Sequence, residues 1–258
     1  MISVICVYNN LEILKSYLLE GLRGQTSSYD LVLVDNTANR FSSAAKALNY
    51  GASLARGDYL MFIHQDVLLP WPDWLSRAES YLDSLPQLGI AGVAGMIDGG
   101  STNDSRGRNI IEHGDPLEVW TWGHPIAKPE PVQTLDECLV LIPKKVFDSR
   151  SFDEVICNGW DLYAVDYSLS IRQVGLGVFV LPLMIHHRSK GHIEESYYVT
   201  LNEVLKKYRN HSRRINTTVD SWNTLIPLSA QRRIKSIRKK FRRAINKASS
   251  LFKWQARL

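Results

Sequence analysis

The carboxylate of Asp66 stands where an apolar run of the sequence ends abruptly. The run Leu60-Met-Phe-Ile63 is followed directly by His64-Gln-Asp66. Open α/β sheets bind their ligands beyond the carboxyl ends of the strands, and a carboxylate at that edge can hold a divalent cation. Asp66 is therefore the first candidate for a metal ligand.

Two earlier apolar runs end in the same way. Residues 2–8 are followed by Asn9 and Asn10, and residues 31–34 are followed by Asp35 and Asn36. Short apolar runs bounded by polar turn residues are typical of buried parallel strands. We expect the three strand ends to meet at one edge of a sheet.

Helical patterns separate these runs. Leucines recur at intervals of three and four over residues 11–22, and alanines with Leu48 do so over residues 44–55, before Gly57. The order strand, helix, strand, helix, strand predicts an α/β fold with a doubly wound half. A nucleotide is the expected ligand of such a half.

Five segments, taken in order and spacing, resemble motifs of the large inverting glycosyltransferase family 2, which has the GT-A fold. They are Val7-Tyr-Asn-Asn10, Leu31-Val-Leu-Val-Asp-Asn36, Asn49-Tyr-Gly51, Ala55-Arg-Gly-Asp-Tyr59 and His64-Gln-Asp66. The His-Gln-Asp form resembles a branch of the family in which a later segment reads Asp-Glu-Cys-Leu, here residues 136–139. The resemblance covers roughly residues 1–210. It implies a Rossmann-like, mostly parallel sheet flanked by helices, with a donor half at 1–98 and an acceptor and catalytic half at 99–215.

By this resemblance, a set of side chains in the first half would bind the nucleotide-sugar donor. Asp35 would accept a hydrogen bond from the base, most often uracil, and its alternative role is a turn residue that caps the next helix. Asn49 and Arg56 would lie under the ribose and phosphates, and their alternative is an ordinary helix surface. The expected donor residues are Val7, Tyr8, Asn9, Asp35, Asn49, Arg56, His64 and Gln65, joined later in the chain by Arg188 and Lys190.

The resemblance also implies a metal site. Asp66 would bind Mn²⁺ or Mg²⁺, which suit carboxylate and phosphate oxygens. A histidine after the apolar run 178–185 would complete the site, and His187 fits better than His186. The side chains of two adjacent residues on a strand point to opposite faces, so only one of these histidines would face the site. His64 stands where the family has an acid, and its alternative role is a histidine packed at a strand end.

The second half would supply the acceptor chemistry. An inverting transfer needs a base that takes the acceptor's proton. Residues 159–172 have helical spacing, and the assignment lies between Asp166, which aligns with a recurrent family motif and is favoured, and Asp161. Alternatives are an N-cap for Asp161 and an ion pair of Asp166 with Arg172 or a lysine. Trp160 and Trp122 are expected acceptor contacts, with hydrophobic packing as the alternative.

The charge of the chain is unevenly distributed. Residues 232–258 hold eleven Lys and Arg and no acid, which leaves 20 basic and 26 acidic residues in the remainder. Apolar residues at helical spacing make this tail a basic amphipathic helix, which is typical of a helix lying in an anionic membrane interface. We assign 216–258 to the tail. Packing against the domain or a partner is the alternative, and the acidic body argues against nucleic acid.

Composition places the protein in a reducing compartment. The three cysteines have no metal-like spacing, and no apolar run reaches about 18 residues. The expected location is cytoplasmic, peripheral on the inner face of the cell membrane. The glycine-rich segment 99–107 is expected to be a loop.

Together these features predict an inverting, metal-dependent glycosyltransferase. It would move a sugar from a nucleotide-diphosphate sugar, UDP being the expected nucleotide, to a glycan or lipid-linked acceptor in bacterial surface polysaccharide synthesis. The alternative is a non-catalytic nucleotide-sugar binding or scaffold subunit, since His64 replaces an acid and the usual acidic pair of the family is absent at Tyr163 and Ala164.

Overall fold

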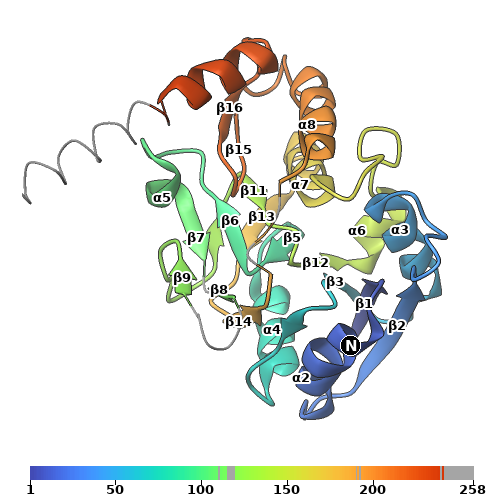
Figure 1. Ribbon diagram of the computed structural model, residues 1–258. Helices are drawn as coiled ribbons and strands as arrows, with labels where there is room; N and C mark the ends of the chain where they lie inside the picture. The colour runs from blue at the N-terminus through green and yellow to red at the C-terminus, as the bar shows by residue number, and fades with distance from the viewer. Residues whose placement is uncertain (110, 115–119, 190, 192, 239, 241–258) are drawn as a thin grey trace, which may run out of the picture.

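A seven-stranded sheet with helices on both faces forms the body of the chain (Figure 1). The computed structural model describes residues 1–109, 111–114, 120–189, 191, 193–238 and 240. In spatial order the strands are β10 (Glu130–Pro131), β13 (Gly177–Val180), β5 (Leu88–Gly92), β12 (Leu139–Pro143), β3 (Tyr59–Ile63), β1 (Ile2–Tyr8) and β2 (Tyr29–Asp35). The α/β prediction is confirmed.

The first half of the sheet is parallel. β1 pairs in parallel with β2 on one side and β3 on the other, and Tyr8 lies opposite Asp35 in the register. The carboxyl ends of these three strands therefore share an edge, as predicted. β12 runs antiparallel between β3 and β5, while β13 is parallel to β5. Most of the strands thus run in one direction, which confirms the mostly parallel sheet.

Helices cover the two faces of this sheet. The first face carries α3 (Ala44–Leu54), α6 (Lys144–Ser149) and α7 (Tyr163–Gln173) over one core cluster. The second carries α1 (Leu11–Leu14), the π-helical turn η1 (Lys15–Leu19), α2 (Glu20–Arg23) and α4 (Trp74–Ser84) over another. Alternate residues of β1 serve the two clusters, because strand side chains alternate between faces.

Gly51 explains why α3 packs so closely on the sheet. A Cβ at this position would meet Ile5 Cγ2 at 2.6 Å and Val34 Cγ2 at 3.1 Å. Only a residue without a side chain allows that approach. The motif residues Asn49-Tyr-Gly51 thus include one whose function is helix-to-sheet packing.

Three small sheets complete the chain. The first consists of β11 (Thr134–Leu135), β6 (Ala94–Met96) and β7 (Gly107–Asn109). The second consists of β4 (Val67–Leu68), β14 (Ile185–His187), β8 (Ile111–His113) and β9 (Trp120–Trp122). The third is the hairpin of β15 (Arg214–Asn216) with β16 (Ser221–Asn223). The apolar run 178–185, expected as one strand, is divided: β13 ends at Val180 and β14 (Ile185–His187) joins a different sheet. The expected loop at 99–107 contains the short helix α5 (Asn103–Arg106), because Thr102 and Ser105 form a capping box.

The hairpin spans the expected boundary between residues 215 and 216 and packs on the domain. Ile215 and Trp222 belong to a third core cluster with α7 and α8 (Glu195–Lys207). Asn216 is held by Gln133, whose side-chain oxygen accepts from its backbone N–H at 2.8 Å, and donates to the carbonyl of Ile97 at 2.9 Å. The hairpin is thereby tied to the residue before β11 and to the residue after β6.

A helix follows the hairpin from residue 228 to residue 238. Its Arg232 pairs with Glu195 and lies 3.8 Å from the ring centre of Tyr198, and its Lys235 pairs with Asp220 at 2.6 Å. Ile237 faces outward and is 58% exposed. The expected amphipathic tail thus begins with its basic side on the domain; residues 239 and 241–258 lie outside the described residues. No helix among the described residues has the length and apolar character needed to cross a membrane.

Candidate metal and donor site

A short β-ladder brings Asp66 and His187 together. β14 pairs antiparallel with β4, which starts directly after Asp66, and the register sets His187 opposite Val67. On its other side β14 is parallel to β8, with His187 opposite His113. The backbone N–H of Arg188 donates to the carbonyl of Asp66 at 3.1 Å, so the ladder extends to the metal candidate itself.

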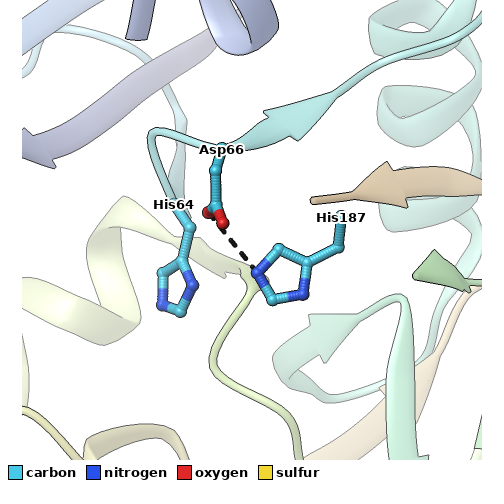
Figure 2. A group of neighbouring side chains, drawn as sticks. All are labelled: His64, Asp66 and His187. Carbon is cyan, nitrogen blue, oxygen red and sulfur yellow. Dashed lines mark ion pairs between the residues drawn. The ribbon is translucent and has the colours of Figure 1, made fainter. Parts of the chain in front are cut away.

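His64, Asp66 and His187 form a cluster of possible metal ligands, in which one ligand atom from each lies within 4.8 Å of the others. Figure 2 shows Asp66 pointing toward His187, with His64 on its other side. Asp66 Oδ1 and His187 Nε2 are 3.4 Å apart. Nδ1 of His187 is buried without a hydrogen-bond partner among the described residues, and the buried Nε2 has only this long contact with Asp66. Buried polar atoms are rarely left so, and a cation is what these donors fit.

The protonation states of the cluster suit a metal. Burial opposes ionisation of Asp66, but the hydrogen bond and charge of His187, with the charge of His64, outweigh it and lower the pKa of Asp66 to about 2. Burial and the neighbouring His187 lower the pKa of His64. The site therefore offers a carboxylate and a neutral imidazole, which are the forms that bind metal ions.

Gln65 ties the ends of β1 and β3 together. Its side-chain oxygen accepts from the backbone N–H groups of Asn9 and Asn10 at 3.1 and 3.0 Å, and its amide donates to Asn9 Oδ1 at 2.7 Å. The predicted donor residues Asn9 and Gln65 are thus brought together with Val7 and Tyr8, at the edge where Asp66 lies. Gln65 thus holds the backbone of Asn9 and Asn10 and the side chain of Asn9 in place.

Asp35 lies at the same edge, exposed, at the end of β2. One of its oxygens accepts from the backbone and the hydroxyl of Thr37 at 2.8 and 2.7 Å. These bonds lower the pKa of Asp35. The turn interaction that the sequence left as an alternative is present, and it uses Oδ1.

Arg56 lies away from this edge, which corrects its expected position, and the side chain of Asn49 is engaged by residues 152–154. Asn49 donates to the carbonyl of Phe152 and to Glu154, and accepts from the N–H of Phe152. Arg56 precedes β3, and its backbone N–H is bonded to Ser3 and Asp30 near the starts of β1 and β2. That is the edge of the sheet opposite to the metal cluster.

The segment Asp136-Glu137-Cys138 forms a wall beside His64, and here the structure adds residues without an expected role. The backbone N–H of His64 donates to the carbonyl of Cys138, and the hydroxyl of Tyr163 donates to the carbonyl of Glu137 at 3.0 Å and lies 3.4 Å from His64 Nε2. The quoted Asp-Glu-Cys-Leu segment was the available signal for Glu137. For Tyr163 the only signal was its place where the family usually has an acid, which did not indicate a contact with His64.

Glu137, just before β12 in the chain, is a buried acid that lies against the N-terminus of α7. Burial and the charges of Asp136 and Asp161 raise its pKa well above the ordinary value, although the backbone N–H groups of Leu162 and Ala164 oppose the shift. One of its oxygens has no partner among the described residues. Asp136, in contrast, has a lowered pKa, because hydrogen bonds from Cys138 and Thr218 outweigh its burial.

Asp161 and Asp166 occupy different environments. The helix α7 begins at Tyr163, so Asp161 precedes it, after Trp160 and before Leu162, whose φ is 70°. Burial and the charge of Glu194 raise the pKa of Asp161. Asp166 is only 2% exposed, and both of its oxygens accept from Lys207 of α8 at 2.8 and 2.9 Å. The expected ion-pair alternative for Asp166 is present, with Lys207; Arg172 pairs instead with Asp98.

The remaining predicted residues differ in how far the structure describes them. Trp160 is 46% exposed, and Arg188 is exposed directly after His187. His113 of β8 has its ring centre 5.6 Å from that of His187, while His186 points away and stacks on Tyr17. Lys190 and the side chain of Trp122 lie outside the described residues.

The fold matches solved glycosyltransferases of the GT-A type at low sequence identity. GalNAc-T7 with UDP, GalNAc and Mn²⁺ has a TM-score of 0.59 at 12% identity over 81% of this chain. The mannosyltransferase PcManGT from Pyrobaculum calidifontis with GDP-Man and Mn²⁺ has 0.56 at 13% over 82%, and S. aureus TarS 1-349 with UDP-GlcNAc has 0.55 at 13% over 81%. This chain spans 47%, 64% and 66% of theirs.

Sequence comparison identifies the family. No curated protein sequence matches the chain. The model of a glycosyltransferase-like family, however, matches residues 3–219, which include the three strand ends, the metal cluster and most of the hairpin. The chain therefore belongs to the glycosyltransferase-like family.

Proposed function

We propose that this protein is a metal-dependent glycosyltransferase that takes its sugar from a nucleoside diphosphate sugar. The observation that carries the proposal is the cluster of His64, Asp66 and His187 at the carboxyl edge of β3, beside the ends of β1 and β2. This is the edge where α/β sheets bind nucleotides. The ligands of the structural neighbours, which are UDP with Mn²⁺, GDP-Man with Mn²⁺ and UDP-GlcNAc, support a donor of this class.

Asp35 and Tyr8 are proposed to bind the base. The hydrogen bonds from Thr37 use only Oδ1 of Asp35, whose side chain lies on an exposed strand end beside the hydroxyl of Tyr8. A carboxylate accepts from a ring N–H, so it favours uracil over cytosine, whose corresponding nitrogen carries no proton. Asn9 and Gln65, already bonded to each other, set the shape of the floor under the nucleotide.

Asp66 and His187 are proposed to hold the divalent cation, with His64 at the third corner. When bound, Mn²⁺ or Mg²⁺ would neutralise the charge that develops on the departing nucleoside diphosphate. Ser189 donates its backbone N–H to Asp66 Oδ2 at 3.2 Å, which fixes the second oxygen of that carboxylate. Arg188, exposed on the same segment, and Lys190 would contact the phosphates.

Asp161 is proposed as the base of an inverting transfer. It would take the proton of the acceptor hydroxyl while that oxygen forms its bond to the anomeric carbon and the bond to the diphosphate breaks on the opposite face. Its raised pKa suits a base, and it lies near Trp160 and the segment that follows His187. Asp166, closed off by Lys207, is proposed to position α7 against α8.

The acceptor is proposed to be a glycan or a lipid-linked sugar of bacterial surface polysaccharide synthesis, at the inner face of the cell membrane. Support comes from the basic tail and from the outward Ile237, which begins an apolar side that the sequence continues through Phe241. An amphipathic helix with this pattern is suited to an anionic interface.

Two adjacent histidines test the metal site. His187→Ala removes a ligand of the cluster, and we expect it to weaken Mn²⁺ binding by roughly 100-fold, a loss at least as large as that from outer-shell changes. His186→Ala, on the opposite face of the same strand, is the matched control and should leave binding unchanged. Titration of Mn²⁺ followed by the electron paramagnetic resonance of the free ion measures both. Equal effects of the two variants would contradict the assignment.

Calorimetric titration with UDP, GDP, TDP and CDP tests the donor site. With Mn²⁺ we expect UDP to bind tightest and CDP about tenfold more weakly, the value of one hydrogen bond. Asp35→Ala should reduce the difference between UDP and CDP, whereas Asp73→Ala, at the start of α4, should not. Absence of metal-dependent binding by every diphosphate would favour the non-catalytic alternative.

The two aspartates of the α7 region are expected to separate in their effects. Asp161→Asn should lower turnover by 100-fold or more, on the order of a general base's contribution, while leaving donor binding intact. Asp166→Asn should lower the melting temperature, because losing the charge beside buried Lys207 costs of the order of 2 kcal/mol. Thermal unfolding and single-turnover rates distinguish them. The reverse pattern would return the base to Asp166.

The acid limb of the wild-type rate profile provides a second test of Asp161. A base must be ionised, and its pKa is raised above 3.8. kcat/KM should therefore fall as the pH drops through a pKa higher than that of an ordinary aspartate. A profile that stays flat down to that ordinary value would contradict the role.

Removal of residues 241–258 tests the membrane proposal. This cut keeps the contacts of Arg232 with Glu195 and of Lys235 with Asp220, which a cut before Arg232 would destroy. It deletes five basic residues with Phe241, Phe252 and Trp254. Sedimentation with anionic vesicles should decrease at least about tenfold, since each basic residue near the surface contributes about 1 kcal/mol. Uncharged vesicles serve as the control, and unchanged sedimentation would remove the proposal.

A further inference from the structure

A large open pocket lies apart from the metal cluster, on the acceptor half of the chain. Its volume is about 1090 Å³, and its walls come from α5 and the residues before it, the β15–β16 hairpin, α8 and the helix at 228–238. Figure 1 shows these elements gathered around the hairpin, away from the strand ends of the donor half. Ile193, which follows the His187 segment, also lines it. A space of this size accommodates a ligand of about two sugar units.

The walls of the pocket are strongly basic. Arg106, Arg214, Arg232, Lys235 and Arg238 all line it, against the single carboxylate of Asp220. Arg232 and Lys235 have partners, Glu195 and Asp220. Arg214 and Arg238 are exposed and form no ion pair with any carboxylate of the described residues. The pocket therefore has a surplus of positive charge.

Arg106 is the residue that points to a ligand. It is only 4% exposed, yet its guanidinium pairs with no carboxylate among the described residues: Nη2 donates to the carbonyl of Gly100 at 2.8 Å, and Nε has no partner. Arg108, two residues on, is in contrast paired with Glu130 at 2.7 Å. A buried guanidinium without an anion is costly, and a bound anion removes that cost. Several guanidinium groups around one space match phosphate oxygens in particular.

The other side of the pocket can take the carbon part of a ligand. Tyr198 lines it with its ring at right angles to that of Trp222, 6.1 Å away, and because Trp222 is only 2% exposed, Tyr198 is the ring that a ligand can reach. Both rings already carry a cation over one face, from Arg232 and Lys235. Aromatic rings next to guanidinium groups suit a sugar with a phosphate attached, because the ring contacts the apolar face of the sugar.

The hairpin connects this pocket with the proposed reaction centre. Thr218, at the turn between β15 and β16, donates to Asp136 at 2.8 Å, and Asp136 directly precedes Glu137 and the wall beside His64. A ligand held against the hairpin thus has a short route to the segment that carries Asp161 and Trp160. A long acceptor could occupy both places at once.

We propose that this pocket is the acceptor subsite and that it binds an acceptor through a phosphate or diphosphate group, held by Arg106, Arg214 and Arg238. The role of the pocket as an acceptor subsite rests on the proposed transferase function. The anion site itself rests only on the residues that line the pocket. Its ligand is distinct from the donor diphosphate, because the donor is held at the strand ends by metal ligands and this pocket contains none of them.

The test is binding of inorganic pyrophosphate in buffer with a chelator, so that the metal-dependent donor site does not contribute. Wild type should bind it, with affinity that falls as salt rises. Arg214→Ala with Arg238→Ala should weaken binding by at least about tenfold, since each removes charge-assisted hydrogen bonds. Arg213→Ala with Arg233→Ala removes the same charge from the same two elements without touching the pocket, and should change binding less than about twofold.

Three ligands identify the source of the anion. N-acetylglucosamine 1-phosphate should bind more tightly than octyl phosphate if the sugar contacts Tyr198, and octyl N-acetylglucosaminide, which lacks the phosphate, should bind weakest. Tighter binding of octyl phosphate would overturn the sugar contact and indicate a lipid headgroup. Equal losses in the two double variants, or no binding of pyrophosphate, would overturn the pocket.

His187→Ala separates this proposal from the proposed function. It should abolish Mn²⁺-dependent nucleotide binding but leave pyrophosphate binding in chelator unchanged, because it lies outside the pocket. If wild type binds UDP with Mn²⁺ but not pyrophosphate in chelator, only the acceptor subsite fails. If pyrophosphate binds and no nucleotide does, only the transferase function fails.

Discussion

The pairing of β14 with β4 and β8 is the constraint on which the candidate site depends. Ser189 and Asp66 are 123 residues apart in the chain, yet the backbone N–H of Ser189 donates a hydrogen bond to the Asp66 carboxylate. The ladder sets His187 opposite Val67 and His113, so the position of the imidazole is fixed by main-chain bonds on both sides. A ligand on a mobile loop would have to be ordered at each binding event, at the cost of conformational entropy. In this fold the ladder orders His187 before any ligand binds.

The carboxylates around this ladder differ in protonation because their surroundings differ. Asp66 and Asp136 have lowered pKa values, held by histidine or by hydrogen bonds, whereas burial raises those of Glu137 and Asp161. Groups with opposite shifts in one site divide its chemistry between them. Asp66 belongs to the cluster of possible metal ligands, Asp136 accepts from Cys138 and Thr218, and the raised pKa of Asp161 is what the proposed base requires. Tyr163 joins the two sides, because its hydroxyl contacts both Glu137 and His64.

The sequence was most informative where the signal is local. Runs such as Ile2–Tyr8 and Tyr59–Ile63 bury both faces, so the strands and their polar ends could be predicted from neighbouring residues. Arg56 was misplaced because a motif gives the order of residues and does not say at which edge of the sheet they lie; its segment turns around Ser3 at the far edge. The ion pair of Asp166 required α8, whose Lys207 lies 41 residues later, and no periodicity indicates such a partner.

The helix that begins at residue 228 turns some of its basic residues toward the domain and its Ile237 toward solvent, which its composition alone does not indicate. Read as charge alone, residues 232–258 are uniformly basic. In the fold, Arg232 and Lys235 are engaged by Glu195, Asp220 and two aromatic rings, so their charge is partly neutralised before any membrane is met. Ile237 faces outward instead. The same helix also forms a wall of the basic pocket. An element that rests on an anionic surface by its apolar side would therefore hold the pocket at a fixed height above that surface, which is the arrangement that an acceptor anchored in the same membrane would require.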